Sequence, residues 1–255
     1  MPFSDAFVDP SAVLAPDVRV GRFTVVAAGV RVGKGSVLGN HVTIDEGTEL
    51  GEGVVVGDGS WVGKPPTKAA RSATTKDRLL PPARVGDGVR IGASATIYRG
   101  AVVGPRVFVA DLATVREDSS VGEGTIVGRL VTVENRCTVG RFCKIETGAY
   151  VCALSTVGDY CFIAPNVTFT NDNFLGRTEK RFALHKGPIL EAGARIGANA
   201  TLLPGVVIGE DALIAAASVV TKDVPARKIA MGVPARVKGD VDPEELFRNQ
   251  KGYLP

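Results

Sequence analysis

Aromatic residues and histidine are scarce in this chain of 255 residues. Phe, Trp and Tyr together make up 6% of it, whereas glycine occurs 31 times, so aliphatic side chains and backbone must fill the interior. Only two histidines are present and the four cysteines include no CxxC pair, which argues against a zinc site and predicts no metal. The formal charge of +3 is too small to indicate nucleic-acid binding.

Membrane-spanning and secretory segments are also missing. No run approaches the length of about 18 apolar residues that crosses a bilayer, and residues 1–7 lack a basic start followed by an apolar run. We therefore expect a soluble, cytoplasmic protein that binds neither membrane nor nucleic acid.

A repeat of six residues runs through most of the chain. An aliphatic residue recurs at every sixth position from Val8 to Val62, from Val85 to Ile163 and from Leu190 to Val220. Small or β-branched residues usually follow four positions later, and such units are too short for helices. The repeat predicts short strands joined by corners, three to a coil, in an all-β parallel β-helix of about ten coils.

Two interruptions of the repeat predict loops extruded from the β-helix, at about 64–84 and 170–188. The first is rich in Pro, Lys and Arg; it either covers the nucleotide of a substrate or is a solvated loop. Past the last repeat, Asp242 precedes Pro243 and two acids, a typical helix start. We expect a β-helix domain over 1–237 and a tail over 238–255 with a short helix from Pro243 to Asn249.

The cysteines and one histidine have a structural interpretation. Cys137, Cys143 and Cys161 fall on the small inward position of the repeat, which predicts core packing with reduced thiols; a redox or metal role is the alternative. His41 lies in an early repeat and is expected on the surface.

The C-terminal third carries the most specific motifs. Residues 196–209, 217–225 and the segment Gly-Val-Pro-Ala-Arg at 232–236 are similar to the coenzyme A-binding end of hexapeptide-repeat acetyltransferases. This resemblance implies a left-handed coil, although parallel crossovers are generally right-handed. It also implies a homotrimer with closed symmetry and acetyl-coenzyme A (acetyl-CoA) as the acyl donor.

Basic and small residues in this region are candidates for binding the donor. Lys and Arg outnumber Asp and Glu between residues 176 and 238. Lys222, Lys228 and Arg236 are candidates for the phosphates of coenzyme A, and Ala216 and Ala217 for close approach of its pantetheine arm. A solvated basic face and alanines that merely fill the repeat are the alternatives.

A second motif indicates the acceptor. Residues 169–172, Phe-Thr-Asn-Asp, and residues 144–148, Lys-Ile-Glu-Thr-Gly, resemble N-acetyltransferases that act on nucleotide-linked amino sugars. In that group the large loop helps to form the active-site cleft between subunits. The resemblance therefore implies an amine as the acceptor.

Amine acylation sets the catalytic candidates, because the amine must be neutral and negative charge builds on the carbonyl oxygen. Asp172 is a candidate to orient or deprotonate the amine, Asn171 to donate hydrogen bonds, and Glu146 is a second carboxylate. His185, where the loop rejoins the β-helix, is the one histidine considered catalytic. Hexapeptide acyltransferases commonly use a histidine base, and some amino-sugar relatives act without any protein base.

Asn166, Asn173 and Arg177 are the candidates for substrate binding around the same loop. Asn and Asp at the mouth of a loop also commonly form turns through their own side chains. The structural role and the functional role both remain open for these residues.

The sequence thus predicts an acetyl-CoA-dependent N-acetyltransferase acting on a nucleotide-linked amino sugar in cell-surface polysaccharide biosynthesis. The alternatives are an O- or N-acyltransferase for another acceptor, such as an amino acid or lipid precursor, with acyl-acyl carrier protein as a further donor, and a non-catalytic trimeric scaffold. A γ-carbonic anhydrase is excluded because that branch needs three histidine ligands and the chain has two histidines.

Overall fold

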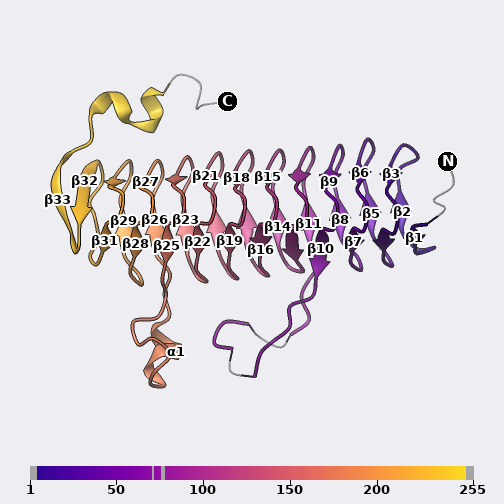
Figure 1. Ribbon diagram of the computed structural model, residues 1–255, viewed down its shortest axis with the longest axis horizontal. Helices are drawn as coiled ribbons and strands as arrows, with labels where there is room; N and C mark the ends of the chain where they lie inside the picture. The colour runs from indigo at the N-terminus through magenta and orange to yellow at the C-terminus, as the bar shows by residue number, and fades with distance from the viewer. Residues whose placement is uncertain (1–4, 71, 76–77, 251–255) are drawn as a thin grey trace.

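The chain winds into a parallel β-helix with three sides, seen along its length in the computed structural model, which describes residues 5–70, 72–75 and 78–250 (Figure 1). Each side is a sheet: sheet A has 11 strands, sheet B 10 and sheet C 12. From β1 to β31, consecutive strands belong to sheets A, B and C in turn. The predicted all-β parallel β-helix is confirmed.

The strands of sheet A are β1 (Phe7–Val8), β4 (Val25–Val26), β7 (Thr43–Ile44), β10 (Trp61–Lys64), β13 (Thr96–Tyr98), β16 (Thr114–Val115), β19 (Thr132–Val133), β22 (Tyr150–Val151), β25 (Thr168–Phe169), β28 (Thr201–Leu202) and β31 (Val219–Val220). Those of sheet B are β2 (Val13–Leu14), β5 (Arg31–Val32), β8 (Glu49–Leu50), β11 (Arg84–Val85), β14 (Val102–Val103), β17 (Ser120–Val121), β20 (Thr138–Val139), β23 (Thr156–Val157), β26 (Ile189–Leu190) and β29 (Val207–Ile208). Those of sheet C are β3 (Arg19–Val20), β6 (Val37–Leu38), β9 (Val55–Val56), β12 (Arg90–Ile91), β15 (Phe108–Val109), β18 (Ile126–Val127), β21 (Lys144–Ile145), β24 (Phe162–Ile163), β27 (Arg195–Ile196), β30 (Leu213–Ile214), β32 (Lys228–Gly232) and β33 (Ala235–Asp240).

The core follows the six-residue repeat. The second residue of almost every strand points inward. The chain turns the corner at the residues two and three positions after it, as at residues 117–118 after Val115. Ile44, Ile97 and Leu202 are fully buried, and Phe169 is the largest buried side chain. Like residues stack directly above one another because neighbouring coils pair 18 residues apart, as Val115 does with Val133.

Three features differ from the expectation. Strand β32 adds a parallel strand to sheet C beyond the last predicted repeat at Val220, and it then pairs antiparallel with β33 in a hairpin that no repeat predicts. The second loop contains a short helix, α1 (Lys180–Leu184).

The terminal helix predicted over 243–249 forms as two 3-10 turns, η1 (Pro243–Glu245) and η2 (Phe247–Asn249). The Asp242 side chain accepts a hydrogen bond from the Glu244 N–H, as expected of an N-cap. The ring of Phe247 stacks on that of Tyr160 with centroids 5.3 Å apart, so this part of the tail returns to the β-helix. Strand β33 runs across position 237, and the division into a domain and a tail stays a prediction.

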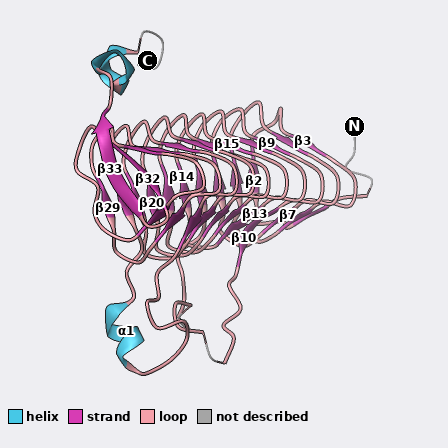
Figure 2. Ribbon diagram, turned by 60° about the vertical axis from the view of Figure 1, so that its left-hand side comes forward, coloured by secondary structure: helices cyan, strands magenta, loops and turns pink. Residues whose placement is uncertain are grey.

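Both predicted loops leave the same edge of the β-helix. The first loop (65–83) follows β10 and the second loop (170–188) follows β25, and both of these strands lie in sheet A. The loops project from one side in two views about a vertical axis (Figures 1 and 2). We name the edge where the chain passes from sheet A to sheet B the A–B edge, and the edge where it passes from sheet C to sheet A the C–A edge.

Five coil steps separate β10 from β25, which corresponds to about 24 Å along the axis. The loops nevertheless meet: Ala70 and Ser72 of the first loop and Thr178, Arg181 and other residues of the second line one cavity of about 280 Å³. In the described part of the chain, no helix has the length and apolar character to span a membrane.

Candidate functional site

Asp172 organises the start of the second loop. Its Oδ1 accepts a hydrogen bond from the Phe174 N–H at 2.8 Å, and its Oδ2 accepts one from the Gly176 N–H at 2.8 Å. Two cationic or basic groups lie beside it, with Arg181 Nη1 3.5 Å and His185 Nε2 3.7 Å from Oδ2. The carboxylate therefore closes a turn and also faces the predicted histidine.

The pKa of Asp172 lies below its ordinary value. Desolvation pushes this pKa upward, but the hydrogen bonds from Gly176 and Phe174 and the nearby His185 lower it by more. Asp172 is therefore ionised at neutral pH, where it can hold a protonated or polarised partner. A carboxylate with a depressed pKa is a weak base on its own.

Asn171 belongs to a line of residues along the A–B edge. Glu117, Asn135, Ala153 and Asn171 are spaced 18 residues apart, one per coil, and occupy the same corner position. Asn171 Nδ2 donates to the Ala153 carbonyl at 3.1 Å, and Asn135 Nδ2 donates to Glu117 Oε1 at 3.1 Å. We call these four residues the edge ladder.

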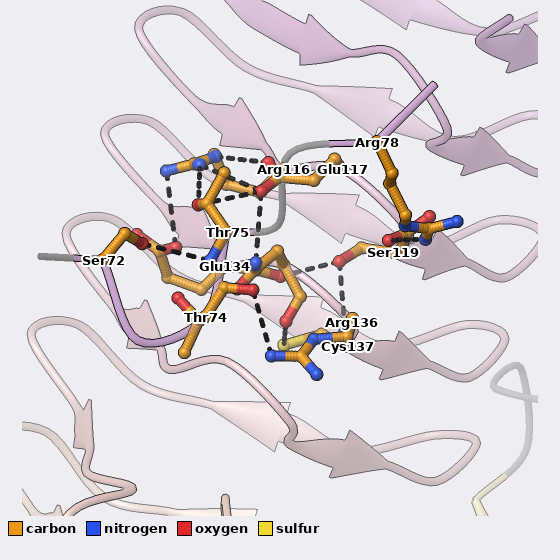
Figure 3. Close-up of polar contacts among 12 residues, drawn as sticks. Ser72, Thr74, Thr75, Arg78, Arg116, Glu117, Ser119, Glu134, Arg136 and Cys137 are labelled. Atoms are coloured by element: carbon orange, nitrogen blue, oxygen red, sulfur yellow. Dashed lines mark hydrogen bonds and ion pairs between the residues drawn. The ribbon is translucent and has the colours of Figure 1, made fainter. Parts of the chain in front are cut away.

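Glu117 and Asn135, the first two residues of the edge ladder, are buried. The first loop covers this part of the edge (Figure 3). Glu117 is only 3% exposed, and its carboxylate accepts hydrogen bonds from Arg116 Nε at 2.8 Å and from Thr75 Oγ1 at 3.1 Å. Arg136 Nη2 donates to the Thr74 carbonyl at 3.1 Å, and Arg78 pairs with Asp118. The first loop is therefore bonded to the β-helix, at least in part, and is not simply a solvated excursion.

Burial and ion pairing act in opposite directions on Glu117. Desolvation raises the pKa of this carboxyl, but the hydrogen bonds and charge of Arg116 and the hydroxyl of Thr75 lower it overall. Glu117 is thus an ionised carboxylate in a nearly closed space. Arg116 also lies 3.6 Å from Glu134 and over the ring of Tyr98, 4.7 Å from its centroid.

Other predicted residues lie on the C–A edge. Backbone hydrogen bonds stack its corners, from the Ala217 N–H to the Ala198 carbonyl at 2.8 Å and from the Asn166 N–H to the Thr147 carbonyl at 3.1 Å. Ala216 and Ala217 are exposed there, as is Asn166. Glu146 lies on the same edge and pairs with Lys144 at 3.3 Å.

The three basic candidates for coenzyme A have different surroundings. Lys222 follows β31 on the A–B edge and is exposed. Arg236, in β33, is exposed and donates to the neighbouring Ala235 carbonyl at 2.8 Å. Lys228, in β32, forms an ion pair with Asp240, so part of its charge is neutralised within the terminal hairpin.

The structure thus divides the predicted site between two edges that flank sheet A. Asp172, His185 and Asn171 lie together at the A–B edge, with Asn173 and Arg177 exposed in the second loop. Glu146, Asn166, Ala216 and Ala217 lie on the C–A edge. No contact between Glu146 and Asp172 is present in the described residues.

Glu117 and Asn135 are the polar residues that the motifs do not indicate. The same corner of the A–B edge is exposed in other coils, at Pro10 and Glu46, whereas Glu117 and Asn135 are buried next to the first loop. The available signal is the coil spacing, because positions 117, 135 and 171 are polar and differ by one or two multiples of 18 residues.

Cys137, Cys143 and Cys161 are buried, as the repeat predicts, and Cys152 is buried as well. All four are buried and free, and desolvation raises the pKa of Cys137 to about 12 and that of Cys152 to about 11. Thiols of this kind are weak nucleophiles. Within residues 5–70, 72–75 and 78–250, no group of three or more His, Cys, Asp or Glu residues is arranged to hold a metal ion. His41 is exposed and stacks on Phe23, with ring centroids 5.0 Å apart.

Family models match the repeats. The model for bacterial transferase hexapeptide (six repeats) matches residues 187–222, and the model for the hexapeptide repeat of succinyl-transferase matches 29–64 and 82–110. These matches and the β-helix confirm the resemblance to hexapeptide-repeat acyltransferases that the sequence shows.

Curated relatives match shorter stretches. The chain is 36% identical over 101 residues to galactoside O-acetyltransferase of Escherichia coli, covering 38% of this chain and 50% of that protein. It is 51% identical over 53 residues to dTDP-3-amino-3,6-dideoxy-alpha-D-galactopyranose 3-N-acetyltransferase of Aneurinibacillus thermoaerophilus, covering 21% of this chain and 28% of that protein. The aligned regions span half or less of these relatives' lengths.

Solved structures show the same fold. An Arabidopsis UDP-N-acetylglucosamine acyltransferase superposes with a TM-score of 0.53 at 20% identity, covering 98% of this chain and 76% of that one. The corresponding O-acyltransferase of Moraxella catarrhalis gives a TM-score of 0.51 at 20% identity, covering 95% and 74%. At this identity the likeness concerns the fold alone.

Proposed function

We propose that this protein is an acetyl-CoA-dependent N-acetyltransferase whose acceptor is a nucleotide-linked amino sugar. The observation that carries the proposal is the placement of two kinds of residue on the two edges that flank sheet A. Small exposed residues line the C–A edge at the C-terminal end, and polar residues beneath two loops line the A–B edge. The first arrangement suits an extended donor and the second a polar acceptor.

The C–A edge has the shape that a pantetheine arm requires. From Ala217 through Asn199 to Asn166, successive corners stack by backbone hydrogen bonds of 2.8 and 3.0 Å, which corresponds to about 5 Å per step. Side chains as small as alanine leave the backbone open to an extended chain laid along the axis. Arg236 in the terminal hairpin supplies charge for the phosphates, and so does Lys222, which lies at the same end of the β-helix but on the A–B edge.

The acceptor site belongs to the A–B edge and its loops. Asn166 and Asn171 are five positions apart on opposite edges, so at most about 17 Å of extended chain separates them. A cleft between two protomers, with the C–A edge of one facing the A–B edge of its partner, brings donor and acceptor together. This arrangement agrees with the homotrimer that the family resemblance implies.

In this proposal the acceptor amine attacks the thioester carbonyl carbon. The C–N bond forms, the C–S bond breaks, and the thiolate of coenzyme A leaves, while the amine loses one proton. His185 is the candidate to accept that proton, and the ionised Asp172 beside it stabilises the resulting imidazolium. Asn171 Nδ2 is committed to the Ala153 carbonyl, so Asn171 supports the edge more than it faces the substrate.

Calorimetric titration with acetyl-CoA tests the donor half. We expect saturable binding by the wild type and at least a tenfold loss of affinity in the Lys222→Ala/Arg236→Ala variant, because each removed charge weakens phosphate binding. A matched Arg19→Ala/Arg31→Ala variant removes two exposed charges at the N-terminal end and should bind normally.

The acceptor half is tested by thiol release from acetyl-CoA in the presence of a panel of dTDP- and UDP-linked amino sugars. Acetylation of the amine, identified by mass spectrometry, supports the proposal. Binding of acetyl-CoA with transfer only to hydroxyl or amino-acid acceptors would refute the amino-sugar assignment and leave the acyltransferase in place.

A further inference from the structure

The two loops that project from the A–B edge form the walls of one cavity of about 280 Å³. The first loop contributes two small residues, Ala70 and Ser72. The second loop contributes the rest of the lining: Gly176, Thr178, Glu179, Arg181 and Phe182. Ala70, Thr178 and Glu179 are exposed, so a ligand can enter this cavity from solvent.

Lining residues of this cavity contact the Asp172–His185 pair. The Gly176 N–H donates to Asp172 Oδ2 at 2.8 Å, and Arg181 Nη1 lies 3.5 Å from the same oxygen. The ring of Phe182 packs edge-on against that of His185, with centroids 6.2 Å apart. The cavity therefore adjoins the two residues that the proposed mechanism uses.

Gly176 leaves the approach to the Asp172 carboxylate open. Of the described residues, a Cβ at this position would meet one atom within 4 Å, Arg181 Nη1 at 3.8 Å. The φ of Gly176 is +83°, which glycine adopts without strain. A group bound in the cavity can therefore pass close to this backbone and reach the carboxylate that it holds.

The lining has the chemistry of a site for a sugar ring. Phe182 is 49% exposed and offers an aromatic surface against which the C–H face of a hexose packs. Arg181 lies over one face of this ring, 4.6 Å from its centroid, and presents N–H donors, while the Glu179 carboxylate accepts hydrogen bonds. One cation and one anion balance in the lining, which favours a ligand with hydroxyl groups over a phosphate.

The wall that the first loop supplies is held in place. Ser72 Oγ accepts a hydrogen bond from the Thr75 N–H at 3.1 Å, and Thr75 Oγ1 donates to Glu117 Oε1 at 3.1 Å. The Ser72 hydroxyl can still donate its own proton to a ligand. Because this wall is already ordered, little conformational freedom is lost when a ligand binds.

The size of the cavity suits one hexose ring. Its volume of about 280 Å³ is about nine times the share of one water molecule in the liquid. Sites that enclose a whole drug-sized ligand usually measure about 300–1,000 Å³, so a sugar nucleotide extends beyond this cavity. The sugar ring is then the part of the acceptor that the two loops enclose.

We propose that the cavity between the two loops binds the hexose ring of the acceptor. Phe182 packs against the ring, and Glu179 and Arg181 form hydrogen bonds with its hydroxyl groups. The amino group is directed past Gly176 toward Asp172, where the proposed mechanism removes its proton. The inference rests on the proposed function and deepens it, because it assigns the sugar to a cavity that needs both loops.

Two variants that change opposite walls of the cavity test this assignment. Phe182→Ala removes the aromatic surface, and Ala70→Trp places a bulky ring in the cavity from the first loop. Thiol release from acetyl-CoA is measured with the dTDP- or UDP-linked amino hexose that the wild type acetylates. We expect each variant to raise the KM for this acceptor by a factor of about ten or more, whereas the KM for acetyl-CoA should not change.

Each variant has a matched control on the same element. Leu184→Ala removes an exposed side chain of α1 that does not line the cavity, and Ala69→Trp places the same ring at the neighbouring exposed position of the first loop. Both controls should keep the wild-type KM values. Melting temperature and oligomeric state, measured on every variant, identify any that fails to fold, and Phe182→Ala carries the test if Ala70→Trp does not fold.

An unchanged acceptor KM in the folded cavity variants would overturn the subsite and leave the proposed function standing, because the wild type would still acetylate the amino sugar. An equal rise of the KM in the matched controls would also overturn the subsite. Failure of the wild type to acetylate any amino sugar of the panel would overturn the proposed function and the subsite together, so the two failures are distinguishable.

Discussion

Replacing Glu117 with glutamine should release the first loop from the β-helix without unfolding the coils. Glu117→Gln keeps Oε1, which bonds Thr75, Asn135 and Arg116 Nη2. It turns an amide N–H toward Arg116 Nε, where the carboxylate Oε2 now accepts a hydrogen bond at 2.8 Å. Arg116, whose side chain is 19% exposed, then loses its nearest anion. Glu134, 3.6 Å away, compensates only in part.

The magnitude follows from the kind of bond that is lost. A hydrogen bond to a charged group contributes about 1.5–3 kcal/mol, and an unpaired buried charge adds a penalty. Allowing for Glu134, we expect the free energy of loop opening to fall by about 2 kcal/mol, which is a factor of roughly 30 in the population of the open loop.

Hydrogen exchange with mass spectrometry measures this population directly. Peptides covering the first loop should exchange about 30-fold faster in the variant, in line with the loss of about 2 kcal/mol, whereas peptides covering β19 and β20 should not change. Glu123→Gln is the control, because Glu123 pairs with Arg106 at the exposed surface, where such pairs contribute little. Loop exchange that is no faster in Glu117→Gln than in the control would refute the reasoning.

Three further outcomes are expected. Ala216→Trp, which puts a bulky ring on the proposed path of the donor, should raise the KM for acetyl-CoA at least tenfold, whereas Ala93→Trp, at the same corner position in a coil near the first loop, should not. Phe169→Ala should lower the free energy of unfolding by about 3–5 kcal/mol because it empties the core, and the exposed Phe108→Ala should change it far less in chemical denaturation. The lowered pKa of Asp172 stabilises the second loop above about pH 4, and this stabilisation is lost as the pH falls through the lower pKa of the folded state. Below about pH 4, hydrogen exchange of residues 170–188 in the wild type should therefore accelerate relative to the intrinsic exchange rate of the unfolded chain. The Asp172→Asn variant should show no such acceleration.

The repeat predicts the fold so well because each aliphatic residue of the repeat can be buried only in the interior of the coil. Once Val115 pairs with Val133, every sixth residue is committed to the interior, and the two interruptions must leave the coil. The terminal hairpin of β32 and β33 was not predictable in this way, because its residues follow no six-residue pattern and its pairing depends on sheet C being open at the last coil.

The candidate site was less predictable. Asp172 is predicted because it ends the motif Phe-Thr-Asn-Asp at an interruption of the repeat, and His185 is predicted because it is a histidine where that loop rejoins the β-helix. Glu117 and Asn135 occupy corners that are ordinarily exposed, and their burial depends on where Thr74 and Thr75 of the first loop come to rest. That contact joins residues 42 positions apart, and no local pattern encodes it.

The stacking of coils fixes distances along the β-helix axis in steps of one coil. Each coil advances the chain by about 4.8 Å and returns it to the same edge after 18 residues. Removing 18 residues between β13 and β25 would bring the points where the two loops leave the β-helix one coil closer, and both loops would stay on the A–B edge. Removing six would keep the core pattern but turn the second loop onto a different edge. The length of molecule that the two loops can hold between them is therefore adjustable only in whole coils, which gives such proteins a discrete way to change the size of what they bind.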